Sequence, residues 1–435
     1  MALLSVKVIH FSITPLAGSP IRIVKALTEH TDVKARLVVL QPHAYGERTF
    51  ENDLTWEHDR EEALSLLEEA DIIHLHHYMD LENNLFGIKF KDFLNRKKRL
   101  VYQFHSTPFF IANGDKALLR RIMNEKMPQL VISQYPERFY PRARVVPNIV
   151  PLDEELYRRK KPAGDYVSIF FAPSVSLGSW ESRWDTKGFP ETCFLLERIS
   201  RRNPKVKLRI IQNTPHSACL KERQCSHINI DDMVTGSFHL CSLEGLAQGL
   251  PTFAYLDTRI LWNIHEMTGS NTLPWMNFRL EEAENPLKIL IADSELRDEI
   301  GENSRRWMER YWNDQDMIRH YVGAYQDLLE GTDVFQEPRF NIYNKRSVWF
   351  VRGADDVIWE ARRKHFPIPL LLRVRYLFEL FNQQIGKRTL AIELGKALLS
   401  SLRCIFQDRR RKAESTNQWF EHAIDECSDV RPDVH

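Results

Sequence analysis

The chain has 435 residues, of which 43% are hydrophobic and 27% are charged. This length exceeds what one hydrophobic core usually supports, so two domains with an appendage are expected, and the composition excludes a disordered, collagen-like or disulfide-scaffold protein. Lys and Arg total 60 against 59 Asp and Glu, so no global charge would gather nucleic acid, and no nucleic-acid partner is expected.

The six cysteines include no Cys-x-x-Cys pair, and the first of them is Cys193. This spacing argues against a zinc site and favours a reduced, cytoplasmic compartment. The first ten residues lack the basic segment, apolar run and cleavage site of a signal peptide and are interpreted as the start of a first strand. No run approaches the roughly 18 to 20 apolar residues that a membrane span requires.

Up to residue 150, short apolar runs alternate with segments of helical period, which indicates a βαβ series with a parallel sheet. The expected strands are residues 4–11, 35–40, 71–75, 100–104, 130–133 and 144–147. After the first run, Gly18 forms a turn, Ser19 is predicted as the N-cap of a helix and Pro20 as its first residue. A helix N-terminus after a parallel strand suits a phosphate or carboxylate, although an ordinary β-to-α turn explains the same residues.

Two prolines within residues 145–153, followed by the charged segment 154–165, indicate a domain boundary. Strand-like runs then resume at residues 167–172, 206–212, 227–230 and 252–255, with helical segments such as 189–201 between them. We therefore expect an α/β fold of two Rossmann-like domains. The expected divisions are an N-terminal acceptor-side domain at 1–150, a C-terminal nucleotide domain at 151–330 and a helical, basic and aromatic extension at 331–435.

The most informative segment is residues 226–255, in which a glycine-containing loop leads into Cys241-Ser-Leu-Glu-Gly-Leu-Ala-Gln-Gly-Leu-Pro. A helix starting after Phe238 would turn its free N–H groups toward a diphosphate, and Glu244, one turn in, would accept hydrogen bonds from ribose hydroxyls. Gly249 and Pro251 then end the helix and lead into a buried strand. This segment resembles the donor-site signature of glycosyltransferase family 4.

One position departs from that family's pattern. Most members have a second glutamate eight residues before the ribose-binding one, where this chain has Gly236. The segment is similar instead to a subgroup in which an aspartate, matched here by Asp231, precedes a glycine and an aromatic residue. The departure affects the prediction of which residues contact the sugar more than it affects the resemblance to the family.

Two further segments extend the resemblance. Residues 171–176 and 183–190 resemble a basic loop that ends in Lys-Gly ahead of a helix, and Lys187 and Arg183 are the cations predicted to stabilise a diphosphate leaving group. For each of them a solvated loop cation is the alternative interpretation. Residues 146–150 resemble the interdomain turn, and residues 292–313 with 317–329 resemble the closing helices, so that the likeness covers roughly residues 1–330.

Histidines follow two strands of the first domain, at the edge where open parallel sheets bind ligands. His105 matches the histidine that faces the donor sugar in this family. The spacing of His74, His76 and His77 is similar to that of metal ligands. His76 and His77, however, point to opposite faces of a strand. We therefore expect these histidines to be buried or to lie at the rim of the site, and we expect no metal.

The resemblance implies a GT-B fold and a metal-independent, retaining transfer of a sugar from a nucleotide diphosphate donor to a glycan, lipid-linked or other glycoconjugate acceptor, as in polysaccharide biosynthesis. It implies no cofactor beyond the nucleotide-sugar co-substrate. The predicted catalytic residues are His105, Lys187 and Arg183, and the predicted donor-binding residues are Gly18, Ser174, Lys187, Asp231, Gly236, Phe238, Ser242, Leu243 and Glu244.

Two alternatives stay open. Gly236 in place of a glutamate is compatible with a glycan- or nucleotide-binding protein that kept the fold and lost catalysis. A nucleotide-sugar epimerase would need carboxylates for deprotonation that the sequence does not place.

The extension interleaves aromatic and aliphatic residues with Arg and Lys between residues 366 and 412. Such a pattern suits helices lying on an anionic bilayer, which would make the chain a peripheral protein of the inner membrane face. Helices packed back on the domains explain the same pattern.

Overall fold

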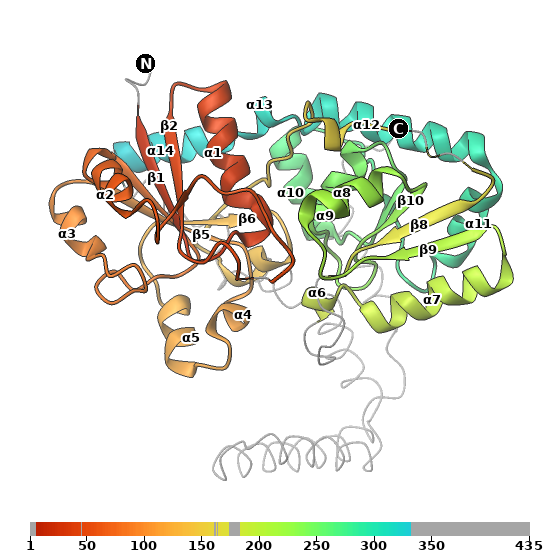
Figure 1. Ribbon diagram of the computed structural model, residues 1–435, viewed down its shortest axis with the longest axis horizontal. Coiled ribbons are helices and arrows are strands. Elements are labelled where there is room, and N and C mark those ends of the chain that lie inside the picture. Colours follow the sequence, from red (N-terminus) through yellow and green to blue (C-terminus); the bar gives the residue numbers. More distant parts are fainter. Residues whose placement is uncertain (1–5, 45, 161, 163, 174–182, 332–435) are drawn as a thin grey trace, which may run out of the picture. The chain divides into compact units, whose positions relative to one another are not determined.

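The computed structural model describes residues 6–331 apart from 45, 161, 163 and 174–182. Within these residues the chain forms two parallel sheets flanked by helices, and both sheets belong to one compact unit (Figure 1). The expected α/β class with two Rossmann-like parallel sheets is therefore confirmed. The helical extension predicted from residue 331 onward lies, after its first residue, outside the described residues.

The first sheet has the strand order β3-β2-β1-β4-β5-β6-β7, and neighbouring strands are parallel. Its strands are β1 (Lys7–Ser12), β2 (Lys34–Val39), β3 (Leu54–Thr55), β4 (Ile72–His76), β5 (Arg99–Phe104), β6 (Gln129–Ile132) and β7 (Arg144–Val146). Its helices are α1 (Ser19–His30), α2 (Arg60–Glu69), α3 (Phe90–Asn95), α4 (Pro108–Ala112) and α5 (Lys116–Met123), with short 3-10 turns η1 (Leu16–Gly18) and η2 (Tyr135–Phe139). All of these strands except β3 lie on runs predicted from the sequence.

The second sheet has the order β12-β11-β10-β8-β9, again with parallel neighbours. Its strands are β8 (Val167–Phe171), β9 (Val206–Ile210), β10 (Ile228–Ile230), β11 (Thr252–Ala254) and β12 (Met276–Asn277). The helices around it are α6 (Arg183–Thr186), α7 (Phe189–Arg202), α8 (His216–Gln224), α9 (Leu240–Ala247) and α10 (Thr258–Thr268), preceded by the 3-10 turn η3 (Glu155–Tyr157). The short β12 was not predicted.

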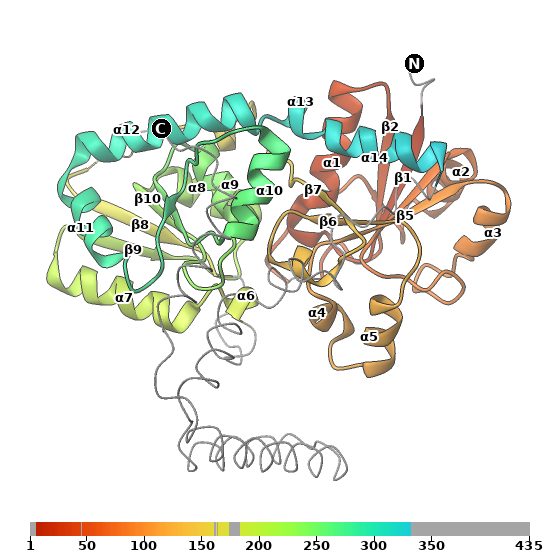
Figure 2. The same ribbon diagram turned by 180° about the vertical axis from the view of Figure 1, so that it is seen from behind.

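The closing helices are α11 (Glu284–Ala292), α12 (Ser294–Tyr311), α13 (Asp314–Met317) and α14 (Arg319–Glu330). In both views α14 lies beside the strands of the first sheet (Figures 1 and 2). Tyr321 of α14 donates a hydrogen bond to the Pro147 carbonyl at 2.9 Å, and the hydroxyl of Tyr325 lies 2.7 Å from Nδ1 of His74 on β4. The chain thus returns to the first sheet after completing the second, while the divisions at residues 150 and 330 stay predictions.

The two faces of the first sheet have different neighbours. Because side chains alternate along a strand, Val8 and His10 of β1 face one side and Ile9 and Phe11 the other. The side of Val8 packs with residues of α1 and α14, and the side of Ile9 packs with residues of α2 and α3. The buried histidines of β1 and β4 therefore lie under α14.

The start of α1 differs from the prediction. Gly18, not Ser19, is the N-cap, with φ of 76° in the left-handed region, and Ser19 is the first helical residue. The Ser19 hydroxyl donates instead to Oδ1 of Asn148 at 2.9 Å. Glycine meets the need for a positive φ without strain, so the turn leaves the serine free to bond the segment after β7.

Among the described residues, no helix combines the length and the apolar character needed to cross a bilayer.

Candidate functional site

Two predicted residues, Lys187 and Asp231, meet at the carboxyl ends of the second sheet's strands. Asp231 directly follows β10, and Lys187 precedes α7 in a left-handed conformation with φ of 53°. The Lys187 ammonium lies 3.3 Å from Oδ1 of Asp231 and donates hydrogen bonds to the Ala172 carbonyl at 2.9 Å and to Sγ of Cys241 at 2.7 Å. Both charged side chains are almost fully buried, so this is a desolvated ion pair against the first turn of α9.

Lys187 and Asp231 stay charged although both side chains are buried. Burial by itself would lower the pKa of Lys187, but Cys241 and Asp231 beside it raise that pKa above its ordinary value. Burial would likewise raise the pKa of Asp231, and Lys187 and His239 instead hold that pKa well below its usual range. Both groups are therefore charged near neutral pH.

Glu244, predicted to bind ribose, is the centre of a buried charge cluster. Its Oε1 accepts hydrogen bonds from Nη2 of Arg22 at 2.8 Å and from Nε2 of His216 at 2.9 Å, and its Oε2 accepts one from Nη1 of Arg223 at 2.7 Å. Only 3% of the glutamate is exposed. Despite burial, Arg223 and His216 hold the pKa of Glu244 well below its usual range. Arg22 comes from α1, so the cluster joins the two sheets.

Buried charges of both signs gather in this region. Lys187, Arg22 and Arg223 lie with Asp231, Asp232 and Glu244, and all six side chains are buried. Three cations and three carboxylates balance in number. Because Lys187 lies against the first turn of α9, its fixed charge and the helix N-terminus together suit a negatively charged ligand.

The first turn of α9 also has polar atoms without partners. The backbone N–H of His239 donates to Oδ2 of Asp231 at 2.6 Å. The hydroxyls of Ser242, in α9, and Ser237, ahead of it, are buried and have no hydrogen-bond partner. Buried hydroxyls are normally hydrogen-bonded, so these two hydroxyls near the start of α9 are available to bond a ligand.

Other predicted donor residues hold α9 in place. Phe238 and Leu243 are buried in the hydrophobic core, where the Phe238 ring lies 5.0 Å from that of Trp275. Gly245 packs so closely on the second sheet that a Cβ there would lie 2.4 Å from Nδ2 of Asn229. Phe238 and Leu243 therefore act through packing, and the helix approaches β10 closely because residue 245 has no side chain.

Gly236 has a structural reason for being glycine. Its φ is 79°, and a Cβ would lie 3.0 Å from Oδ2 of Asp257. Its carbonyl accepts a hydrogen bond from Nη2 of Arg138 at 3.2 Å, and Arg138 also pairs with Asp257. A glutamate at this position would strain the loop, which accounts physically for the departure noted in the sequence.

The remaining predicted residues are placed less fully. Ser174 lies outside the described residues, and Arg183 opens α6 with a side chain that is likewise not described. Gly18 caps α1 one turn before Arg22, so its turn sets the direction of the helix that reaches Glu244.

The histidines of the first sheet form a buried cluster that His105 adjoins. His74 and His76 are buried, as expected. Nδ1 of His76 lies 2.9 Å from Nε2 of His105 and its Nε2 lies 3.0 Å from Nδ1 of His10. Burial lowers the pKa of His10 to about 3 and that of His77 to about 4, and it holds those of His74, His76 and His105 well below the ordinary value. All are neutral near pH 7.

This cluster has the atoms of a metal site but not the geometry. Ring nitrogens of His10, His74 and His76 lie within 4.8 Å of one another. The rings are stacked, with planes 15° to 28° apart. A ring nitrogen binds a metal in its own ring plane, so three nearly parallel rings do not converge on one ion.

Several residues of these clusters were not predicted: Arg22, His216, Arg223, Cys241, His10 and Tyr325. The three basic residues around Glu244 lie in helices without any motif, and only the tertiary fold brings them together. The sequence could have indicated His10, since it occupies the same relative position on the first strand as His74 does on the paired strand.

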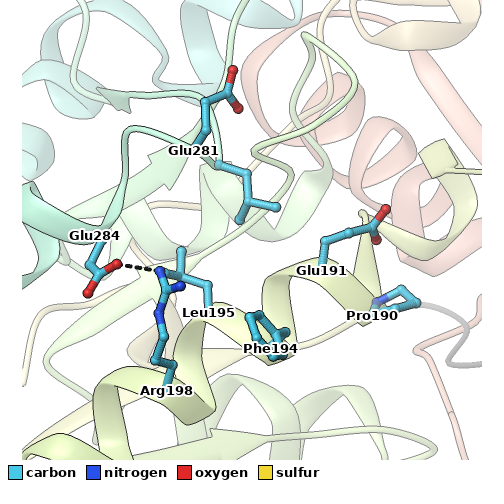
Figure 3. A pocket seen from close by; sticks show the side chains of 8 residues that line it. Pro190, Glu191, Phe194, Leu195, Arg198, Glu281 and Glu284 are labelled. Atoms are coloured by element: carbon cyan, nitrogen blue, oxygen red, sulfur yellow. Dashed lines mark hydrogen bonds and ion pairs between the residues drawn. The ribbon is translucent and has the colours of Figure 1, made fainter.

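An open pocket lies elsewhere, between α7 and residues 280–284 (Figure 3). Phe194, 68% exposed, lines it, and Arg198 pairs with Glu284 across it. No predicted site residue lines this pocket.

No family model and no curated protein matches the sequence. Among solved structures, sucrose-phosphate synthase from Thermosynechococcus elongatus is 12% identical, with 75% of this chain and 99% of that chain covered and a TM-score of 0.43. A glycosyltransferase from Rickettsia africae is 12% identical, with 75% and 100% covered and a TM-score of 0.46. UDP-GlcNAc 2-epimerase from Neisseria meningitidis is 10% identical, with 73% and 98% covered and a TM-score of 0.41.

Proposed function

We propose that this chain is a glycosyltransferase that takes a sugar from a nucleotide diphosphate donor, with retention of configuration, and passes it to a glycan or lipid-linked acceptor. The observation that carries the proposal is the buried cation Lys187 against the first turn of α9, with Glu244 one turn further along the same helix. A nucleotide diphosphate would lie against this cation and the helix N-terminus, and its ribose would lie near the carboxylate. The likeness of residues 226–255 to the family 4 donor signature supports the same assignment.

In this proposal Lys187 and the N–H groups of α9 bind the diphosphate. When the glycosidic bond breaks, negative charge accumulates on the leaving phosphate, and fixed cations stabilise that charge in the transition state more than in the ground state. Three neighbours already take up the three hydrogens of the Lys187 ammonium group. In this proposal Lys187 therefore acts on the diphosphate through its fixed charge, or it exchanges one of these bonds for a phosphate oxygen. Arg183 is the second predicted cation.

His105 would face the donor sugar from the first sheet. It follows β5 and is only partly buried, while its partner His76 is buried. No general base is assigned to the protein, since in a retaining transfer a donor phosphate oxygen can take the acceptor proton. The nucleotide sugar is then a co-substrate and no other cofactor is required.

A ligand screen tests the proposal directly. The full-length protein is mixed with UDP-, GDP-, ADP- and dTDP-sugars in the presence of EDTA, and thermal stabilisation and sugar release are measured. We expect one donor to stabilise the protein, as a ligand that binds only the folded state must, and Lys187→Ala to abolish that stabilisation. Absence of stabilisation by every donor would overturn the proposal.

The second candidate is a binding protein without turnover, and Gly236 is the observation that favours it. Such a protein would be stabilised by a donor yet release no sugar with any acceptor offered. An epimerase would instead interconvert donor sugars without an acceptor, which product analysis in the same screen detects.

Membrane attachment through residues 366–412, at the cytoplasmic face, is part of the proposal on sequence grounds only. Four consecutive cations, Arg409, Arg410, Arg411 and Lys412, would contribute attraction to anionic lipid. Replacing all four by Gln should reduce sedimentation with phosphatidylglycerol vesicles. Unchanged sedimentation would favour helices packed back on the domains.

A further inference from the structure

Two short helices with an apolar and basic surface stand at the carboxyl edge of the first sheet. We name residues 108–126, which contain α4 and α5, the α4–α5 hairpin. α4 begins three residues after His105, and it packs against α5. The two helices lie side by side and project from the first sheet in both views (Figures 1 and 2). The hydroxyl of Tyr140 donates to the Ser106 carbonyl at 2.9 Å and holds the connection between β5 and α4.

Only one face of each helix packs on the hydrophobic core. Ala112 of α4 and Ile122 of α5 are buried in the core beneath the hairpin. Ile111, Leu118 and Leu119 pack against the same core and are partly buried. The helical period therefore turns the remaining positions of both helices away from the core.

The outward positions combine large apolar side chains with cations. Phe109 and Phe110 of α4 are 57% and 55% exposed, and Met123 of α5 is 52% exposed. Lys116 and Arg120 are exposed as well. Because residues three and four positions apart share one face of a helix, Lys116, Arg120 and Met123 form one row along α5.

The apolar side chains are gathered rather than scattered. Among the described residues, nine large hydrophobic side chains are exposed, and three of them belong to the hairpin. A fourth, Leu85, lies on the segment between β4 and α3, which Arg121 of α5 contacts by pairing with Asp80 at 3.2 Å. Single exposed hydrophobic residues are ordinary, whereas a gathered group marks a surface that meets a partner or a membrane.

The hairpin also has an excess of positive charge. Residues 108–126 contain four cations and two carboxylates, while the whole chain has 60 and 59. Both carboxylates bond the backbone of the hairpin itself. Oδ1 of Asp115 accepts from two N–H groups at the start of α5, and Oε1 of Glu125 accepts from the N–H groups of the two residues that follow it. The outward surface is therefore suited to a negatively charged partner.

We propose that the α4–α5 hairpin docks on an anionic phospholipid bilayer. Phe109, Phe110 and Met123 enter the headgroup region, and Lys116 and Arg120 contact the lipid phosphates. Exposed apolar side chains beside cations are the combination that holds a helix at such an interface. Charge alone would also attract a nucleic acid or an acidic peptide, but neither gives the three apolar side chains a role. This surface is separate from residues 366–412.

Docking through the hairpin orients the first sheet. Since α4 begins three residues after His105, the carboxyl edge of the sheet would face the bilayer. On the proposed function, on which this step alone rests, a lipid-linked acceptor would reach that edge along the membrane surface. The docking itself requires neither a donor nor an acceptor.

Vesicle sedimentation of the full-length protein, without any donor, tests the docking. The vesicles contain phosphatidylglycerol with phosphatidylcholine, or phosphatidylcholine alone, and we expect binding to the anionic vesicles only. One variant combines Phe109→Ser with Phe110→Ser, and a second combines Lys116→Gln with Arg120→Gln. Each should lower the partition coefficient about 10-fold, because each removes two of the contacts on which interfacial binding depends.

Matched controls remove the same kinds of side chain from the second sheet's elements. Phe194→Ser acts on a side chain of α7 that is even more exposed, and Lys205→Gln combined with Lys221→Gln removes two exposed cations. We expect unchanged binding in both controls. Hydrogen exchange adds a local measurement, since the amides of residues 108–123 should exchange more slowly when anionic vesicles are present.

The variants are expected to fold because the substituted side chains are exposed, and thermal unfolding checks this. The ring of Phe109 contacts that of Phe139 at 5.7 Å. If the double phenylalanine variant does not fold, Phe110→Ser alone replaces it.

Weaker binding in both hairpin variants, unchanged controls and slower exchange in the hairpin support the docking. Unchanged binding in both hairpin variants overturns it, as does unchanged exchange. Weaker binding in the cation variant alone indicates charge attraction without insertion and also overturns it. A dimer in the absence of vesicles that the phenylalanine variant dissociates would assign the surface to a second copy instead. Because no donor is present, the donor screen and this test fail independently.

The extension is tested separately in the same assay. Glutamine at residues 409–412 is combined with each hairpin variant. If the hairpin binds lipid by itself, the hairpin variants lower the partition coefficient by a similar factor with and without the four glutamines. A loss that disappears in the glutamine background would assign the lipid contact to the extension and overturn the docking of the hairpin.

Discussion

Nη2 of Arg22 lies 2.8 Å from Oε1 of Glu244, and this bond joins α1 of the first sheet to α9 of the second. The carboxylate to which the sequence assigns a ribose is thus already the partner of a buried guanidinium from the other sheet. In the proposed function, a donor would add to these bonds or exchange with them. Substitution of Glu244 therefore changes stability as well as binding, and the two effects have to be separated.

We expect Glu244→Gln to destabilise the protein by about 3 to 5 kcal/mol, because Arg22 and Arg223 would be left buried without their counter-charge. Urea unfolding measures this loss. If it is below about 1 kcal/mol, water reaches the cluster and the pair is not desolvated as described.

Glu137→Gln is the matched control for that variant. Glu137 pairs with Arg259 and is 2% exposed, and this pair also connects the two sheets, from η2 to α10. We expect a loss of stability of similar size but unchanged stabilisation by the donor that the screen identifies. Equal loss of donor stabilisation in both variants would mean that Glu244 acts only through folding.

Lys187→Met tests leaving-group stabilisation. The methionine keeps much of the volume but removes the cation, so we expect kcat to fall about 10²- to 10³-fold, as for loss of one transition-state donor, with a smaller change in KM. Sugar transfer or donor hydrolysis measures both constants. The exposed Lys205→Met is the control, and a variant of Lys187 that retains wild-type kcat would remove the residue from the mechanism.

The buried histidines predict loss of stability in mildly acidic solution. The pKa of His10 is about 3 in the folded protein and about 6.5 when unfolded, so between these values the unfolded chain binds the extra proton. Above pH 6.5 the buried histidines therefore do not reduce the free energy of unfolding. Below pH 6.5 that free energy falls by about 1.4 kcal/mol per pH unit for each such histidine.

Urea unfolding at pH 7 and pH 5 measures that slope. We expect His10→Gln to reduce this slope of unfolding free energy against pH by the contribution of about one proton. The substitution His58→Gln, at an exposed position, should leave the slope unchanged. A wild-type stability that does not change between these pH values would contradict the burial of neutral imidazoles.

Substitution by alanine is expected to have opposite effects on stability at two glycines. A Cβ at Gly301 of α12 would lie 2.2 Å from the Gly249 carbonyl oxygen, whereas one at Gly323 of α14 would meet no atom within 4 Å. We expect Gly301→Ala to cost about 1 to 3 kcal/mol through overpacking and Gly323→Ala to stabilise by about 0.5 to 1 kcal/mol. Thermal unfolding compares them, and a neutral Gly301→Ala would show that α12 can shift away from the end of α9.

Much of the fold was predictable because hydrophobic period and turn residues are local. The runs at residues 100–104 and 167–172 became β5 and β8 with ends within one residue of the prediction, since short, mainly apolar runs are typical of buried parallel strands. The two-residue strands β3 and β12 were missed, because pairs such as Leu54–Thr55 become strands only by lying beside a longer neighbour. The N-cap of α1 was misplaced by one residue because glycine and serine both suit that position, and only the backbone conformation distinguishes them.

By itself the sequence determined the α/β class, the order of the strands along the chain and the residues of the α9 segment, all of which depend on neighbours within a few positions. Only the tertiary structure decided the partners of Glu244 and of His105. Arg22 and Glu244 are 222 positions apart, and His10 and Tyr325 are 315 apart. No local pattern records such contacts, because they arise when elements from distant parts of the chain pack together and the free energy of burial selects which polar groups must pair.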